Sequence, residues 1–262
     1  IYLDDVIIFS RTYEEHLERL QQVFQRIRDS GLKLAPRKCK FFHERVVYVG
    51  HQVSNSGIAP DPEKSACIRD WPRPKTPEDV RRFLGFAGYY RKFVKDFAKI
   101  AAPLSSLMPT PMKKKQRGRK KIDTSQRPWT WGEPEETAFT TLKSALSSPP
   151  VLGYADFTKP FELHTDASAL GLGAVLYQEQ AGGKKVIAYA SRSLGKAEKN
   201  YPAHKLEFLA LKWAVTEKLR DYLYGAKFIV LTDNNPLTYV LTSAKLDACG
   251  HRWLAALSAF DF

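Results

Sequence analysis

A block of basic residues in the middle of the chain constrains its fold more than any other feature. Residues 113–121 hold seven Lys and Arg and no apolar side chain, and they lie in a stretch bounded by Pro109 and Pro128. Such a run of like charges has nothing to bury and is normally disordered. We therefore predict two folded parts, with a linker at residues 109–128 between them.

The linker also carries much of the positive charge. The 262 residues include 41 Lys and Arg against 28 Asp and Glu, a formal net charge of +13, of which seven charges come from the linker. A basic balance favours a polyanionic partner such as nucleic acid. The linker itself has three open interpretations: it holds a phosphate backbone, it is a nuclear-import signal, or it only connects. Its basic residues are Lys113, Lys114, Lys115, Arg117, Arg119, Lys120 and Lys121.

The rest of the composition argues against several classes of protein. Apolar residues make up 44% of the chain, which is ordinary for a globular protein. Cys39, Cys67 and Cys249 form no Cys-x-x-Cys pair, so we expect neither a zinc site nor a disulfide framework. Without a signal peptide or a membrane-spanning apolar run, we expect an intracellular protein with no membrane partner. Neither end resembles a natural terminus, so we predict a piece of a longer protein.

The part before the linker is predicted to combine a β-hairpin, short strands and helices. Residues 1–10 are two apolar arms with Asp4 and Asp5 at the turn, a hairpin pattern. Thr76 precedes Pro77 and two acids, which is typical of a helix start. The other predicted elements are a helix at 12–30, strand character at 39–53, a short helix from 62 to about 71 and a last helix at 96–108.

The part after the linker has the pattern of an α/β fold. Strands of alternating or apolar character are followed by a long amphipathic helix and a further strand, which predicts a mixed sheet covered by helices. The predicted elements are a helix at 133–147, strands at 161–165, 171–178 and 185–191, a helix at 203–224, a strand at 228–231, helices at 236–241 and 252–257, and a strand beginning at 258.

Three acids occupy apolar surroundings in this second part. Asp166 follows a strand, Glu207 lies among apolar residues of the long helix, and Asp233 ends the next strand. Acids in such places are costly unless a positive partner joins them, and hard divalent cations prefer carboxylate oxygen. Where these elements pack together, the three acids would hold two ions about 3.5–4 Å apart and hydrolyse a phosphodiester.

This second part resembles the RNase H domain of retroviral and long-terminal-repeat retrotransposon Pol polyproteins, most closely the gypsy type. The resemblance implies an RNase H-like domain at residues 129–262, with Asp166, Glu207 and Asp233 as ligands of Mg²⁺ or Mn²⁺ that cleave RNA in an RNA–DNA hybrid. The family carries a fourth acid beyond the end of this chain, so we predict a truncated domain. The matching segments are 165–168, 171–176, 188–192, 201–202, 207–210 and 232–233.

The paired acids near the start point to a second metal site. A hairpin with Asp4 and Asp5 at its tip presents both carboxylates to one place, as polymerase chemistry with two metals requires. Residues 1–10 resemble the palm hairpin of reverse transcriptases, and segments 31–34, 38–41, 48–51 and 83–93 resemble segments downstream of that hairpin in gypsy-type elements. The resemblance implies a palm end at 1–60 and thumb or connection helices at 61–108.

The same resemblance implies contacts with a template-primer. Tyr2 and Leu3 would line the nucleotide and the primer end, and residues 48–51 would hold the primer strand. The basic and aromatic residues 89–92 either contact a nucleic-acid backbone or only pack a helix, and the sequence leaves both open. Besides the linker residues, the predicted nucleic-acid contacts are Tyr2, Leu3, Tyr48, Gly50, His51, Arg91 and Lys92.

We therefore predict a fragment of a retroelement reverse transcriptase and ribonuclease H. The family's other palm carboxylate and its fingers lie upstream of residue 1, so we expect no DNA synthesis by this chain alone. Its partners would be nucleic acid and the remainder of the Pol polyprotein, in a cytoplasmic particle or the nucleus. Two alternatives stay open: a degenerate or host-adopted binder without catalysis, and an isolated hybrid-cleaving nuclease.

Overall fold

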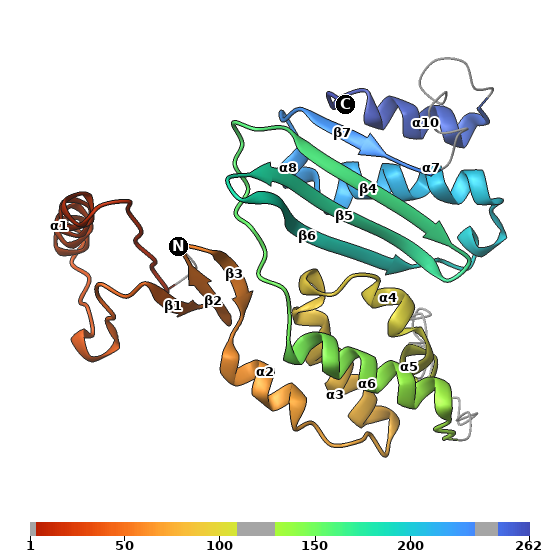
Figure 1. The fold of residues 1–262 in the computed structure, drawn as a ribbon, viewed down its shortest axis with the longest axis horizontal. Helices are drawn as coiled ribbons and strands as arrows, with labels where there is room; N and C mark the ends of the chain where they lie inside the picture. The colour runs from red at the N-terminus through yellow and green to blue at the C-terminus, as the bar shows by residue number, and fades with distance from the viewer. Residues whose placement is uncertain (1–3, 109–128, 234–245) are drawn as a thin grey trace, which may run out of the picture.

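The computed structural model describes residues 4–108, 129–233 and 246–262, and Figure 1 shows their arrangement. Apolar side chains form two hydrophobic cores, one among the helices of the lower lobe and one between a four-stranded sheet and α7. Tyr2, Leu3, the basic linker residues and the predicted helix at 236–241 lie outside the described residues. Across the described ranges, no helix combines the length and the apolar character that crossing a membrane requires.

The first described segment is irregular, so the predicted hairpin at residues 1–10 is wrong in its second arm. Asp4 lies in a turn, Asp5 makes an isolated bridge, and residues 6–10 form no strand. Side chains here have little to pack against, since Val6 is 48% exposed and Phe9 is 74% exposed. A strand pair without a buried face is only marginally stable in water, which explains the irregular backbone.

A long helix follows this segment, as predicted. α1 (Tyr13–Asp29) begins after Thr12, whose hydroxyl accepts a hydrogen bond from the Glu15 backbone N–H, and Gly31 follows its end with a φ of 68°. Leu20 is the buried residue of this helix. Since a surface helix is stabilised mainly by burying its apolar stripe, α1 gains little from packing on the described residues.

A small antiparallel sheet connects the first segment and α1 to the helices that follow in the chain. It has the order β1–β2–β3, formed by β1 (Arg45–Tyr48), β2 (His51–Ser54) and β3 (Gly57–Pro60). Gly57 has a φ of 134°, and a Cβ there would lie 2.1 Å from the Leu152 carbonyl oxygen. Only glycine allows this approach, which lets residue 58 of β3 pair with residue 152.

The first core lies among helices from both sides of the linker. Thr76 and Asp79 form a capping box at the start of α3, as the sequence predicted for a helix start. Phe83 of α3 packs on Phe139 of α6 with ring centroids 4.8 Å apart, so α6 belongs to this core although it follows the linker. The helices are α2 (Pro62–Arg69), α3 (Pro77–Tyr89), η2 (Arg91–Phe93), α4 (Phe97–Ile100), α5 (Ala102–Ser106) and α6 (Glu133–Ser147).

The second core lies between a mixed sheet and the helix α7. The sheet has the strand order β6–β5–β4–β7, in which β4 and β7 are parallel and the other pairs antiparallel, as the predicted α/β fold requires. Apolar residues of alternate strand positions face α7, among them Leu163 and Leu176, both fully buried. The strands are β4 (Phe161–Ser168), β5 (Gly171–Gln180), β6 (Gly183–Ser193) and β7 (Phe228–Leu231).

The predicted helix at 203–224 is interrupted. α7 (Ala203–Trp213) continues into a π-helical segment, Ala214–Lys218, and then into α8 (Arg220–Leu223). Helical periodicity predicted the buried stripe correctly, but it does not reveal a change of hydrogen-bond pattern within the stripe. After α10 (Ala248–Leu257), the expected strand from residue 258 amounts to one parallel bridge between Lys227 and Asp261.

The two cores meet at the edge strand β6. The Arg91 guanidinium donates to the Ser191 carbonyl oxygen at 2.5 Å, and the Ala98 backbone N–H donates to the Ser191 hydroxyl at 3.0 Å. Asp96 of the same segment lies against Gly173 of β5, where a Cβ would come 2.9 Å from the carboxylate. Helices before the linker therefore pack directly on the sheet that follows it.

Candidate active site

Two of the predicted acids lie at the ends of neighbouring parallel strands. The last paired residues of β4 and β7 are His164 and Leu231, and Asp166 and Asp233 each lie two positions further along. Because parallel strands run side by side in the same direction, both acids emerge at the same end of the sheet. Figure 1 shows this end beside the start of α7, and both acids are exposed.

The third acid, Glu207, reaches this end of the sheet from α7. It is 7% exposed, and its Oε1 accepts a hydrogen bond from the Ala167 backbone N–H at 3.1 Å. Its Oε2 is buried and has no hydrogen-bond partner among the described residues, and the same is true of the Thr165 hydroxyl oxygen. Buried polar atoms are normally paired, so an unpaired carboxylate oxygen calls for an explanation.

The electrostatics of this group show that the three acids are close enough to interact. Burial is the main cause that raises the pKa of Glu207 to about 7, and the charges of Asp166 and Asp233 raise it further. The hydrogen bond from Ala167 opposes this shift, because it stabilises the ionised form. A carboxyl with such a raised pKa beside two other carboxylates is typical of a functional site.

The residues fit a hard divalent ion by their chemistry. Three carboxylates could supply oxygen ligands, and Oε2 of Glu207 is a buried acceptor to which no described residue donates. Within residues 4–108, 129–233 and 246–262, however, no three acidic, His or Cys side chains converge into a ready coordination shell. The structure thus brings Asp166, Glu207 and Asp233 into one neighbourhood without closing a ligand cage.

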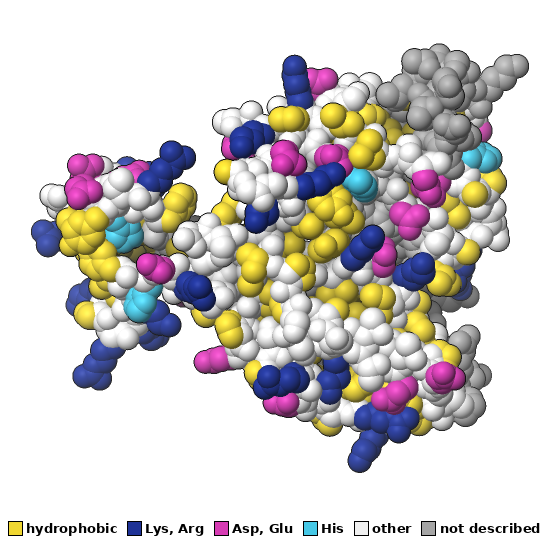
Figure 2. Space-filling view, in the orientation of Figure 1, with side chains coloured by type: hydrophobic (Ala, Val, Ile, Leu, Met, Phe, Trp, Pro, Cys, Tyr) yellow, Lys and Arg dark blue, Asp and Glu magenta, His cyan; other side chains and the backbone are white. Residues whose placement is uncertain are grey.

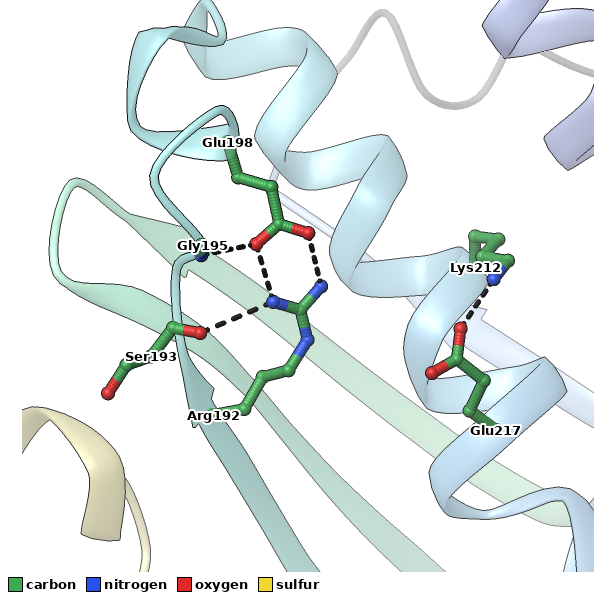
Figure 3. A network of polar contacts seen from close by, with 6 residues as sticks. All are labelled: Arg192, Ser193, Gly195, Glu198, Lys212 and Glu217. Atoms are coloured by element: carbon green, nitrogen blue, oxygen red, sulfur yellow. Dashed lines mark hydrogen bonds and ion pairs between the residues drawn. The ribbon is translucent and has the colours of Figure 1, made fainter. Parts of the chain in front are cut away.

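A salt bridge that the sequence analysis missed supports the chain that leads into α7 (Figure 3). Arg192, at the end of β6, donates to both carboxylate oxygens of Glu198 at 2.6 and 3.0 Å, and Glu198 also accepts from the Gly195 N–H. The guanidinium lies over the ring of Trp213 on α7. This arrangement ties the loop before α7 to both the sheet and the helix that carries Glu207. Its only sequence signal is the pairing of opposite charges six residues apart, which is common and unspecific.

The first acidic cluster is built differently. Asp4 and Asp5 are exposed on the irregular segment, and no third acid of the described residues joins them in a cation site. The Tyr48 hydroxyl donates to the Asp5 backbone carbonyl at 3.3 Å, which links this segment to β1. The structure therefore brings one predicted nucleic-acid contact, Tyr48, beside the predicted palm acids.

The turn that contains the predicted contact Gly50 is strained. Tyr48 pairs with His51, so Val49 and Gly50 form a two-residue hairpin turn with φ values of 46° and 69°. Such a turn favours Asn-Gly, and a β-branched residue with positive φ is an outlier that costs on the order of 1–3 kcal/mol. Contacts from the surrounding residues must therefore offset this cost and hold Val49 in its conformation.

His51 is directed into the protein at this turn. Its Nδ1 lies 2.8 Å from the Val49 carbonyl oxygen, and its ring packs against those of Tyr89, Tyr90 and Phe93. A carbonyl oxygen only accepts, so Nδ1 carries the proton of the neutral ring. Burial, and secondarily the charge of Lys92, lowers the pKa of His51 and favours this neutral form.

The predicted basic contacts Arg91 and Lys92 are both half-buried and pack against aromatic rings. The Arg91 guanidinium donates a hydrogen bond to the Ser191 carbonyl oxygen and lies over the Phe97 ring. The Lys92 ammonium lies over the Phe93 ring. Burial lowers the pKa of both side chains. On the face shown in Figure 2, Lys and Arg side chains alternate with acidic ones and form no continuous stripe among the described residues.

Comparisons with known proteins agree with this architecture. Residues 131–230 match the RNase H-like domain found in reverse transcriptase, and residues 1–53 match the reverse transcriptase (RNA-dependent DNA polymerase) family. The chain is 39% identical over its whole length to the retrovirus-related Pol polyprotein from transposon opus of Drosophila melanogaster. It is 40% identical, over 97% of its length, to that from transposon gypsy of the same organism.

These matches confirm the predicted resemblance to retrotransposon Pol polyproteins, with a reverse transcriptase match at the start of the chain and an RNase H-like match after the linker. It spans 26% of the opus polyprotein and 24% of the gypsy polyprotein, about a quarter of each. Its fold is similar to that of the foamy viral protease-reverse transcriptase solved in complex with an RNA/DNA hybrid. That structure is 23% identical with a TM-score of 0.74, and the match covers 95% of this chain and 33% of that one.

Proposed function

We propose that the protein hydrolyses the RNA strand of RNA–DNA hybrids with two divalent ions, Mg²⁺ or Mn²⁺, held by Asp166, Glu207 and Asp233. The observation that carries the proposal is the buried Glu207 beside the ends of β4 and β7, whose Oε2 has no hydrogen-bond partner in the part of the chain that the structure describes. Support also comes from the match of residues 131–230 to an RNase H-like domain. The foamy viral relative in fold was solved with an RNA/DNA hybrid, which suits the same class of substrate.

Each acid has a distinct part in this proposal. The Ala167 N–H fixes Oε1 of Glu207, so Oε2 is the oxygen that faces the ion site and that holds the proton when the carboxyl is neutral. Because burial raises the pKa of Glu207 to about 7, its carboxyl would have to release this proton in order to hold an ion near neutral pH. Asp166 and Asp233 supply carboxylates from the exposed side. When bound, two such ions activate a water molecule and stabilise the leaving oxygen of a phosphodiester.

A labelled RNA–DNA hybrid tests the proposal directly. With Mg²⁺ or Mn²⁺, we expect the protein to shorten the RNA strand, and Asp166→Asn to reduce the rate about 1,000-fold, equivalent to about 4 kcal/mol. Binding of the hybrid should remain largely intact in this variant. Glu179→Gln is the matched control, since it removes an exposed acid at the far end of β5.

The main alternative is a nucleic-acid binder without catalysis, either degenerate or host-adopted. It differs from the nuclease in one result: the hybrid binds, but neither ion supports cleavage at any protein concentration. The presence of all three acids in one neighbourhood favours the nuclease, because loss of function removes the selection that keeps a costly buried acid such as Glu207.

We further propose that the longer polyprotein carries out RNA-directed DNA synthesis, inside the cell in a particle or the nucleus. In it, Asp4 and Asp5 would bind metal, and Tyr2, Leu3, Tyr48 and Gly50 would contact the template-primer. Support comes from the match of residues 1–53 to the reverse transcriptase family. We expect no primer extension by this chain alone, and extension in the presence of Mg²⁺ would contradict that expectation. The basic linker residues, Arg91 and Lys92 remain proposed backbone contacts.

A further inference from the structure

Two neighbouring tyrosines at the end of α3, its last residue Tyr89 and the capping residue Tyr90, hold the strained turn between β1 and β2. The Tyr89 hydroxyl donates to the Val49 carbonyl oxygen at 2.7 Å, and the Tyr90 hydroxyl donates to the Gly50 carbonyl oxygen at 3.0 Å. Tyr90 is buried at 3% exposure, whereas Tyr89 is 51% exposed and borders the surface. The donors are thus supplied by a helix some 40 residues further along the chain.

A second donor reaches each of the two turn carbonyls. Nδ1 of His51 lies 2.8 Å from the Val49 oxygen, and the Asp61 backbone N–H donates to the Gly50 oxygen at 3.2 Å. A carbonyl oxygen has two lone pairs, so both oxygens are fully used. The turn is therefore fixed by β2, by α3 and by the start of α2 together.

This bonding determines which way the turn amide faces. In a planar trans peptide the C=O and the following N–H point in opposite directions. Since the Val49 C=O is directed toward Tyr89 and His51, the Gly50 N–H is directed away from α3. A backbone N–H in such a place is available to a phosphate or sugar oxygen of a nucleic acid.

We infer that Tyr89 and Tyr90 are positioning residues: their hydroxyls hold Val49 in its unfavourable conformation so that the Gly50 N–H faces a nucleic-acid backbone. His51 belongs to this support and does not itself contact nucleic acid. The inference rests on the proposed binding of a hybrid or template-primer duplex. Positive φ at a β-branched residue persists only where the surroundings over-determine it, and four donors on two oxygens do so.

Amide hydrogen exchange of the protein without nucleic acid tests the support itself. In the double variant Tyr89→Phe, Tyr90→Phe, both rings remain and only the two hydroxyls are lost. We expect the exchange rate of the segment 48–51 to rise about tenfold, as the loss of two hydrogen bonds implies. Unchanged exchange would overturn the inference, whether or not the protein binds any nucleic acid.

Rescue separates positioning from direct contact. We expect the double variant to bind an RNA–DNA hybrid about tenfold more weakly in the presence of EDTA, measured by fluorescence anisotropy. Adding Val49→Asn gives the Asn-Gly sequence that this kind of turn prefers, so the turn should hold without the hydroxyls and affinity should return to within about threefold. If the affinity stays low, the hydroxyls contact the nucleic acid themselves and the inference is wrong.

Tyr154→Phe is the matched control. Its hydroxyl donates to the carbonyl oxygens of Ser54 and Gly57, at the opposite turn of the same small sheet. Exchange at 48–51 and hybrid affinity should stay as in the parent protein, and an equal loss of affinity would show a general loosening of the sheet instead. If the parent protein does not bind either duplex, the proposed function fails, and the exchange experiment alone decides the role of the tyrosines.

Discussion

The two acidic clusters differ in how the chain around them is held. Asp166, Glu207 and Asp233 come from two parallel strands and a helix that share one hydrophobic core. Asp4 and Asp5 lie on an exposed, irregular segment that packs on little else. The difference teaches that, among the described residues, packed elements bring a third carboxylate toward the second cluster but not toward the first. Four predictions test this contrast, in order of expected effect.

Removing the buried carboxylate should have the largest effect. Glu207→Gln should lower the cleavage of an RNA–DNA hybrid about 1,000-fold, because a neutral amide cannot replace a carboxylate ligand. The double variant Asp4→Asn, Asp5→Asn should cleave within about twofold of the parent protein. Single-turnover rates with labelled RNA give both numbers, and equal losses in the two variants would remove the distinction between the clusters.

Mutations in the core beneath α7 should lower the free energy of unfolding more than mutations in the first segment. Leu163 is fully buried beneath α7, so Leu163→Ala should reduce the free energy of unfolding by about 2–5 kcal/mol. Val6 is 48% exposed, so Val6→Ala should change it by less than about 0.5 kcal/mol. Urea unfolding followed by circular dichroism measures both. A large loss from Val6→Ala would show that the first segment is packed more firmly than its exposure indicates.

The raised pKa of Glu207 should make the metal-free protein less stable as pH rises. Between pH 4.5 and about 7 the folded protein keeps the proton that the unfolded chain releases, so raising the pH favours unfolding. The free energy of unfolding should fall by about 3 kcal/mol across this window and then level off. Glu207→Gln should remove this slope in melts with EDTA. A slope that persists unchanged in the variant would assign it to other groups.

Divalent ions should stabilise the folded protein by binding at the second cluster and not at the first. For a millimolar dissociation constant, tenfold excess Mg²⁺ adds about 1.4 kcal/mol to the free energy of unfolding. Asp166→Asn should lose this gain, and Asp5→Asn should keep it, in thermal melts with and without Mg²⁺. Loss of the gain in Asp5→Asn would place an ion at the first cluster.

Local sequence rules predicted the elements around the second cluster well. Apolar strand-forming residues marked β4 and β7, and in the other core Pro77 behind a capping Thr76 marked the start of α3. The proximity of Asp166 and Asp233 to Glu207 was also predictable, because a strand end, a helix and a second strand end have few ways to pack, whereas their binding of metal stays a prediction. These signals succeed where the hydrophobic pattern and the final core agree.

The remaining features depend on contacts distant in the chain. α6 was assigned by its place after the linker, yet its apolar face packs with α3. The π segment after Trp213 and the four donors at the Val49–Gly50 turn have no local signature. The expected strand in residues 6–10 failed because apolar character alone does not supply a surface to bury it.

The most direct test of the account is diffraction from crystals soaked in Mn²⁺, recorded for its anomalous signal. The account predicts peaks that touch carboxylate oxygens of residues 166, 207 and 233, with Oε2 of Glu207 among the ligands. Well-ordered density for all three side chains without any Mn²⁺ peak between them, at an ion concentration that supports hybrid cleavage, would contradict it.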